Sequence, residues 1–210
     1  MIRIIIADDH PIVRAGLRRI VEDEAGMGVV GEAVDGEQLL AMVRQVPADI
    51  ALVDISMPGP DFSVLLRRLK EESPRTRALV LSVFPEEQFA PRAIRAGAMG
   101  YLTKDQSPEQ LVTALRRVHA GSRYISPRLA EWFATRLDEA YVASPLESLS
   151  AREHQVLRCL GAGLNVKAVG ERLSLSPKTV STYRARILEK LDLHSTSELV
   201  RFAVQQGLID

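Results

Sequence analysis

Two adjacent carboxylates, Asp8 and Asp9, end the apolar run near the start of the chain. This run, Ile2–Ala7, has the composition of a strand that is buried on both faces of a parallel sheet. Two acids at its tip repel each other, and they stand where open α/β sheets bind ligands, beyond the carboxyl ends of the strands. The pattern favours a cation site over the simpler alternative, in which Asp9 only caps a helix that begins at Pro11.

Other polar residues stand at the ends of later apolar runs. Asp54 and Lys104 each follow such a run, and Ser82 is the last residue of another. The carboxyl ends of parallel strands lie along one edge of their sheet, so these three residues should converge with Asp8 and Asp9. The sequence therefore predicts a site that contains three carboxylates, a hydroxyl and an ammonium.

This set of groups suits phosphoryl transfer to a carboxylate. The three acids exceed the single ammonium in charge, and one divalent cation with oxygen ligands, Mg²⁺, would balance them. A carboxylate can act as a nucleophile and form an acyl phosphate, while the cation and Lys104 neutralise charge on the phosphoryl oxygens. Asp54 is the best nucleophile, because it is the lone acid after an internal strand and faces Asp8 and Asp9.

Alternating strand and helix patterns must position these groups, and they predict a doubly wound α/β domain with a five-stranded parallel sheet. The predicted strands are Ile2–Ala7, Val29–Ala33, Ile50–Val53, Ala78–Ser82 and Gly100–Leu102. The predicted helices are Pro11–Asp23, Gly36–Val46, Phe62–Glu72, Pro91–Ala96 and Pro108–Ala120.

The first 120 residues resemble the receiver domain of two-component response regulators, because the pattern Asp-Asp, Asp, Ser and Lys is complete. The resemblance implies a flavodoxin-like strand order, 2-1-3-4-5. It implies that Asp54 is the phosphoacceptor and that Asp8, Asp9, Asp54 and the backbone carbonyl of Ser56 hold Mg²⁺.

The same resemblance assigns the switch. Ser82 would bond the phosphoryl group and pull its loop inward, and Lys104 would pair with phosphoryl oxygens. Tyr101 would swing between exposed and buried rotamers, although it could instead be an ordinary aromatic residue packed near the sheet edge.

Two residues depart from the receiver pattern. Phe62 stands where glycine is common, which predicts backbone strain or a shifted loop if that position needs a positive φ. Pro91 falls within the expected fourth helix, so that helix should begin at Pro91 or be kinked there. These departures leave open a receiver that works without phosphorylation, through protein contacts or constitutive dimerisation.

An enzyme is the other alternative, namely a Mg²⁺ phosphohydrolase of the haloacid dehalogenase type. Such enzymes place the nucleophile in an Asp-x-Asp motif after the first strand, whereas the best nucleophile here, Asp54, follows the third. A hydrolase would also leave the carboxyl-terminal part of the chain unexplained.

Residues 121–148 read as a linker that contains an amphipathic helix. Leu129, Phe133 and Leu137 recur every four residues beside Trp132, the single tryptophan of the chain. One apolar face at this spacing predicts that the helix docks onto a domain of its own chain, with a partner helix as the alternative.

The last part of the chain, residues 149–210, reads as four helices. Their predicted bounds are Ala151–Gly161, Val166–Leu173, Pro177–Leu191 and Ser197–Gln206. A capping box at Ser150 starts the first, and a tight turn with Ser176 as cap joins the second to the third. Gly170 would let two helices cross closely, so the pattern favours a helix-turn-helix over a generic helical bundle.

The third of these helices has the faces of a DNA-recognition helix. Val180 and Ile187 point inward, while small polar and basic side chains lie opposite, where they could meet base edges and phosphates. The residues expected to contact DNA are Lys178, Thr179, Ser181, Thr182, Arg184, Ala185, Arg186 and Lys190. No side chain is placed for a strong bidentate contact, so a dimer on paired half-sites would be needed for specificity.

This region resembles the LuxR-type helix-turn-helix, and the order of the two domains resembles the NarL/FixJ class of response regulators. The resemblance implies a transcription regulator rather than an enzyme. Its partners would be a sensor histidine kinase, promoter half-sites in double-stranded DNA and, as a further candidate, RNA polymerase. Phosphorylation would favour a homodimer.

Composition agrees with a soluble, cytoplasmic protein of this kind. The chain has 27 basic and 27 acidic residues and no net charge, with an acidic front and a basic tail. Its one cysteine, Cys159, excludes a disulfide framework and lies in an apolar helical pattern that predicts burial. No apolar run approaches the length of a membrane span, and no secretory signal precedes the first strand.

Overall fold

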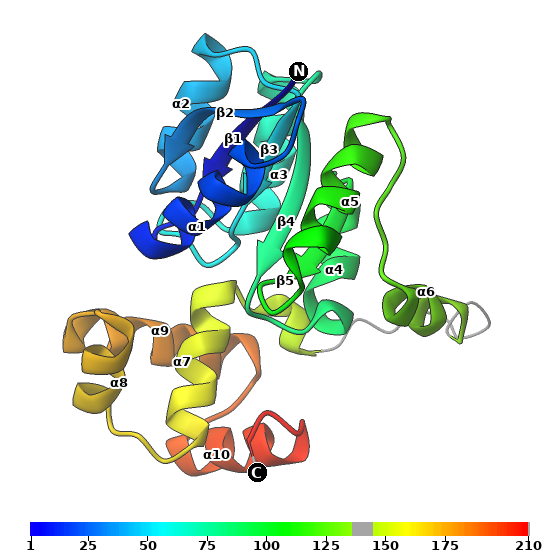
Figure 1. The fold of residues 1–210 in the computed structure, drawn as a ribbon. Helices are drawn as coiled ribbons and strands as arrows, with labels where there is room; N and C mark the ends of the chain where they lie inside the picture. The colour runs from blue at the N-terminus through cyan, green and yellow to red at the C-terminus, as the bar shows by residue number, and fades with distance from the viewer. Residues whose placement is uncertain (136–144, 210) are drawn as a thin grey trace. The chain divides into compact units, whose positions relative to one another are not determined.

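The computed structural model describes residues 1–135 and 145–209, which form two compact units, Met1–Tyr141 and Val142–Asp210 (Figure 1). The predicted position of Leu137 lies outside the described residues. No helix within the described ranges is both long and apolar enough to cross a membrane.

The first unit is built on a five-stranded parallel sheet with the order β2-β1-β3-β4-β5 (Figure 1). The strands are β1 (Ile2–Ala7), β2 (Met27–Ala33), β3 (Ile50–Val53), β4 (Arg77–Ser82) and β5 (Gly100–Thr103). The predicted fold class and strand order are confirmed, and the strands differ from the predicted ranges only at their ends. The central strands are almost fully buried, as expected for a sheet covered on both faces.

Helices alternate with these strands. They are α1 (Pro11–Glu22), α2 (Gly36–Gln45), α3 (Phe62–Glu72), α4 (Glu86–Arg95) and α5 (Pro108–His119). Helices α1 and α5 contact each other, whereas α3 contacts both α2 and α4, which gives the two helical layers of a doubly wound sheet. A further helix, α6 (Pro127–Ala134), packs against α4, in agreement with the predicted docking of the linker helix.

Helix α4 corrects the predicted start at Pro91, because it begins at Glu86 and continues through that residue; the alternative, a kink at Pro91, stays a prediction. Proline inside a helix cannot donate a backbone hydrogen bond. The turn before Pro91 is nevertheless supported by its side chains: Glu86 and Glu87 suit the positive amino end of the helix, and Phe89 stacks on Phe84 with ring centroids 4.6 Å apart.

Phe62, the other residue that departs from the receiver pattern, carries no backbone strain in the loop before α3. Positive φ in this loop falls at Gly59, whose φ is 122°, while Phe62 begins α3 with helical geometry. Asp61 caps the helix by accepting a hydrogen bond from the backbone N–H of Ser63 at 3.0 Å. The Phe62 ring lies beneath the guanidinium of Arg92, 4.6 Å from the ring centroid, and so fills the space between α3 and α4.

Within its described residues, the second unit contains the four predicted α-helices, and a 3₁₀ turn at Pro145–Ser148 precedes them. They are α7 (Ala151–Gly161), α8 (Val166–Leu173), α9 (Pro177–Lys190) and α10 (Thr196–Gln205). Ser150 and Glu153 form the expected capping box at the start of α7. Gly170 lies where a Cβ atom would come within 2.7 Å of the carbonyl oxygen of Leu175, so only glycine allows this tight turn from α8.

Candidate functional site

The predicted polar residues do meet at the carboxyl edge of the sheet. Asp8 follows β1, Asp54 follows β3, Ser82 ends β4 and Lys104 follows β5. The two aspartates are almost completely buried, with 1% of Asp8 and 2% of Asp54 exposed. Buried carboxylates need partners with strong hydrogen bonds or positive charge, so their surroundings define what the site can do.

Lys104 is the positive partner of both buried carboxylates. Its Nζ donates to Oδ2 of Asp8 at 2.5 Å and to Oδ2 of Asp54 at 2.8 Å. Burial alone would lower the pKa of this ammonium, but the charge of Asp54 and the hydrogen bonds to both carboxylates raise it above its usual value. Lys104 therefore stays charged and bridges the ends of β1, β3 and β5.

The second oxygen of Asp54 faces the backbone. Its Oδ1 accepts a hydrogen bond from the N–H of Ser56 at 3.0 Å. Burial raises the pKa of the Asp54 carboxyl, although the charge and hydrogen bond of Lys104 and the N–H of Ser56 oppose that increase. A carboxylate held in this way has a fixed orientation and unused lone pairs, as a nucleophile requires.

The donor set at this edge fits a divalent cation. One ligand atom each from Asp8, Asp9, His10 and Asp54 lies within 4.8 Å of all the others. Three carboxylates in such a cluster match the oxygen preference of Mg²⁺.

His10 is the one member of this cluster that the sequence did not predict. Its Nδ1 lies 2.8 Å from Oδ1 of Asp9 and 3.3 Å from Oδ1 of Asp8, and its backbone N–H donates to that Asp8 oxygen at 2.8 Å. His10 is also the N-cap residue of α1, so the alternative in which Asp9 caps this helix is wrong. The only available signal was its place next to the two acids.

Ser82 and Tyr101 hold the two polar backbone groups of Phe84. The Ser82 hydroxyl accepts from the Phe84 N–H at 3.2 Å, and the Tyr101 hydroxyl donates to the Phe84 carbonyl at 3.0 Å. Both side chains are completely buried, and burial raises the pKa of Tyr101. Ser82 and Tyr101, which the receiver pattern assigns to the switch, thus both bind the backbone of Phe84 between β4 and α4.

The second unit presents α9 as the predicted recognition helix. Val180 and Ile187 are fully buried, while Lys178, Ser181, Thr182, Ala185 and Arg186 are exposed. Ser176 caps the helix by accepting from the Thr179 N–H at 3.1 Å. The exposed face therefore has the small polar and basic side chains that suit the major groove.

Two basic residues of α9 have partners within their own unit. Arg184 donates from Nε and Nη2 to the Thr196 hydroxyl at 2.9 and 2.6 Å. Lys190 donates to the buried carboxylate of Glu153 at 2.6 Å. Both side chains thus tie α9 to neighbouring helices, a role that a helical wheel cannot show.

A receiver-type sheet with an acidic edge, joined to a helix-turn-helix unit, defines a class of bacterial regulators. Residues 4–116 match the family model of the response regulator receiver domain, and residues 147–203 match that of the LuxR family of bacterial regulatory proteins. The chain belongs to the response regulators, with a phospho-receiver domain and a LuxR-type DNA-binding domain. It is a transcription regulator and not a conventional enzyme.

Individual relatives match along the whole chain. The response regulator GacA of Pseudomonas aeruginosa is 40% identical over 100% of this chain and 99% of its own length. UvrY of Escherichia coli is 39% identical over 99% of this chain and 96% of its own. Among solved structures, RcsB of Salmonella typhimurium is 26% identical and covers 97% of this chain and 98% of its own, with a TM-score of 0.60.

Proposed function

We propose that this response regulator is switched by phosphorylation of Asp54, and that a sensor histidine kinase supplies the phosphoryl group. A receiver domain implies a kinase partner. The observation that carries the proposal is the environment of Asp54: a buried carboxylate, hydrogen-bonded to Lys104 and clustered with the acids that follow β1. An isolated buried acid would instead stay protonated and inert.

Each residue at the sheet edge has one role in this proposal. An Asp54 carboxylate oxygen attacks phosphorus, and the bond from phosphorus to the donor breaks as the acyl phosphate forms. The Lys104 ammonium exchanges its Asp54 contact for a phosphoryl oxygen. Asp8, Asp9, Asp54 and the carbonyl of Ser56 would hold Mg²⁺, which when bound neutralises charge on the phosphoryl oxygens.

The switch follows from the hydroxyl of Ser82. A phosphoryl group on Asp54 offers strong acceptor oxygens at the edge where β4 ends. The Ser82 hydroxyl turns to donate to one of them, and Phe84 moves with it. The buried rotamer of Tyr101, whose hydroxyl donates to the Phe84 carbonyl, belongs to one arrangement of this segment, and an exposed rotamer belongs to the other. Phosphorylation shifts an existing equilibrium between two arrangements of this segment.

DNA binding is the proposed output. Helix α9 enters the major groove, with Ser181, Thr182 and Ala185 at base edges. Basic residues and the helix start meet phosphates, with Lys178, Thr179, Arg184, Arg186 and Lys190 as the candidates. Solved neighbours include an RcsB–DNA complex and two RcsB dimers bound to two parallel DNAs. By analogy we expect a phosphorylated homodimer on paired promoter half-sites, with RNA polymerase as a candidate contact.

The proposed division of labour follows the sequence boundaries. Residues 1–120 form the receiver, residues 121–148 the linker and residues 149–210 the DNA-binding domain. We expect the protein to work in the cytoplasm, where kinase and promoter are both accessible.

Intact mass spectrometry tests the proposal. Wild type and Asp54→Asn are incubated with Mg²⁺ and acetyl phosphate, a small phosphoryl donor. Wild type should gain one phosphoryl group and the variant none, since asparagine lacks the nucleophilic oxygen. If wild type gains no phosphoryl group and the phosphoryl mimic beryllofluoride leaves its gel-filtration profile unchanged, the results would favour the receiver that acts without phosphorylation.

A further inference from the structure

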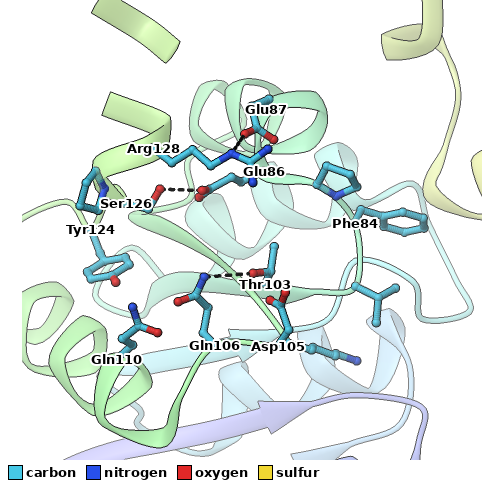
Figure 2. A pocket seen from close by; sticks show the side chains of 14 residues that line it. Phe84, Glu86, Glu87, Thr103, Asp105, Gln106, Gln110, Tyr124, Ser126 and Arg128 are labelled. Atoms are coloured by element: carbon cyan, nitrogen blue, oxygen red, sulfur yellow. Dashed lines mark hydrogen bonds and ion pairs between the residues drawn. The ribbon is translucent and has the colours of Figure 1, made fainter. Parts of the chain in front are cut away.

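The linker helix α6 is fixed to the amino end of α4 by two polar contacts (Figure 2). The Ser126 hydroxyl donates to Oε1 of Glu86 at 2.6 Å, and Arg128 pairs with Glu87. Ser126 is also the cap residue of α6, because its hydroxyl accepts from the Leu129 N–H at 3.0 Å. The Leu129 side chain is completely buried. The first turn of α6 is therefore anchored by its own cap.

Glu86 and Glu87, which bind α6, lie two and three residues after Phe84, whose backbone is hydrogen-bonded to the switch residues. Ser82 and Tyr101 hold the N–H and the carbonyl of Phe84, and Pro85, the next residue, is the N-cap of α4. Glu86, the first residue of α4, is only 7% exposed and turns toward α6. A movement of Phe84 must therefore reach the anchor through a single intervening residue.

A pocket of about 790 Å³ joins the two places (Figure 2). Lys104 and Phe84 line it at the phosphoacceptor edge, and Ser126 and Arg128 line it at the start of α6. Ser126 and Arg128, at the amino end of α6, thus border open space. A shift of these two residues displaces solvent, whereas full release of the helix also takes the buried Leu129 side chain out of its packing.

We infer that α6 is held on α4 in the unphosphorylated protein and that phosphorylation releases it; we call this docked helix the latch. This inference rests on the proposed role of Asp54. When the Ser82 hydroxyl turns toward the phosphoryl group, Phe84 and Pro85 follow it, and the first turn of α4 moves with them. The hydrogen bond from Ser126 to Glu86 and the ion pair between Arg128 and Glu87 then break, and α6 separates from α4. Coupling of this kind is reciprocal, so a weakened latch must make the phosphorylated arrangement easier to reach.

Trp132 makes the latch measurable, because the single tryptophan of the chain lies in α6 and is half-buried. Beryllofluoride with Mg²⁺ serves as the probe for the phosphoryl group, and ¹⁹F NMR measures its binding independently. In the full-length wild type, binding should move Trp132 emission to longer wavelength as the indole enters water. Asp54→Asn should show neither the bound ¹⁹F signal nor the emission change.

A matched set of variants isolates the anchor. Ser126→Asp keeps a residue able to cap α6 but sets a second carboxylate against Glu86, whereas Ser126→Thr keeps the hydroxyl. Without the probe, Ser126→Asp should already show Trp132 emission at the longer wavelength. It should also bind beryllofluoride at least about fivefold more tightly than wild type. Arg116→Ala is the control, since it removes another exposed arginine pair of the same unit, with Glu24 at 2.8 Å. It should behave like wild type, as should Ser126→Thr.

Two results would overturn the latch: bound beryllofluoride with unchanged Trp132 emission in wild type, or unchanged affinity in Ser126→Asp. Absence of the bound ¹⁹F signal from wild type would refute the phosphoacceptor role of Asp54 and the latch with it. The NMR and fluorescence readouts therefore tell the two failures apart.

Discussion

Lys104 and Asp54 lie 50 residues apart in the chain, yet their side chains share a hydrogen bond of 2.8 Å at the carboxyl edge of the sheet. The bond joins the end of β3 to the end of β5 across β4, the strand between them. The bond places the Lys104 ammonium beside Oδ2 of Asp54, where a phosphoryl group would form. Order within the sheet and chemistry at its edge therefore depend on the same contact.

Lys104→Met tests how far this ammonium compensates the buried acids. The methionine keeps most of the side-chain length but removes the charge, so Asp8 and Asp54 face each other without a cation. We expect the free energy of unfolding in EDTA to fall by about 3 kcal/mol, and Mg²⁺ to restore part of it. Urea unfolding with and without Mg²⁺ measures both values. Equal stability of variant and wild type in EDTA would show that the contact does not stabilise the sheet edge.

His154 predicts acid sensitivity of the second unit. Burial, helped by the charge of Arg158, lowers the pKa of His154 to about 4 from an ordinary value of 6.5. The unfolded chain then takes up a proton more readily than the folded chain, so stability is complete above pH 6.5 and is lost as pH falls toward 4. We expect a loss of about 2 kcal/mol between pH 7.5 and pH 5.

Calorimetric unfolding of the full chain across this pH range measures the effect. His154→Leu should flatten the pH dependence of the α-helical second unit, whereas His194→Leu, at an exposed histidine, should not. A wild-type profile that His154→Leu leaves unchanged would assign the acid sensitivity to other groups.

Two helical glycines should respond to alanine with opposite signs. A Cβ at Gly16, in α1, has no neighbour within 4 Å, so Gly16→Ala should stabilise by up to about 1 kcal/mol. A Cβ at Gly170 meets the backbone oxygen of Leu175 at 2.7 Å, so Gly170→Ala should destabilise the second unit despite the better helix propensity. Thermal unfolding of both variants gives the comparison, and a stabilised Gly170→Ala would argue against the close turn after α8.

Alanine variants of Lys178 and Lys190 should distinguish a lysine that only contacts DNA from one that also stabilises the second unit. Lys178 is exposed at the start of α9, so Lys178→Ala should weaken DNA binding at all sequences and reduce the salt slope by about 1. Lys190→Ala leaves the buried Glu153 carboxylate without its ammonium, so it should also lower stability, by only about 1 kcal/mol because the Lys190 side chain is 38% exposed. Binding of the phosphorylated variants to DNA selected from a random pool, over a salt series, measures the first effect. Equal stability of Lys190→Ala and wild type would leave its proposed phosphate contact as its main role.

The sheet and its acidic edge were predictable, because buried parallel strands are continuous apolar runs and their carboxyl ends share one edge. Asp8, Asp54, Ser82 and Lys104 met there for that reason alone. The sequence could not show that one ammonium reaches both buried acids, since that depends on the strand spacing and on the length of the Lys104 side chain.

Prediction from the sequence was least certain where local patterns conflicted. Helix α4 runs through Pro91 because aromatic stacking and the acids of its first turn support it, and these contacts come from the folded unit. Phe62 needs no special backbone because Gly59 supplies the positive φ. His10 was missed because its approach to Asp8 and Asp9 depends on how α1 begins.

The most direct test of the central claim is to locate the phosphoryl group. Borohydride reduces an acyl phosphate on aspartate to homoserine, and peptide mass spectrometry then identifies the position. After treatment with acetyl phosphate and Mg²⁺, we predict homoserine at position 54, and none when Mg²⁺ is withheld. Homoserine at Asp8 or Asp9, with Asp54 unchanged, would contradict the assignment of the phosphoacceptor.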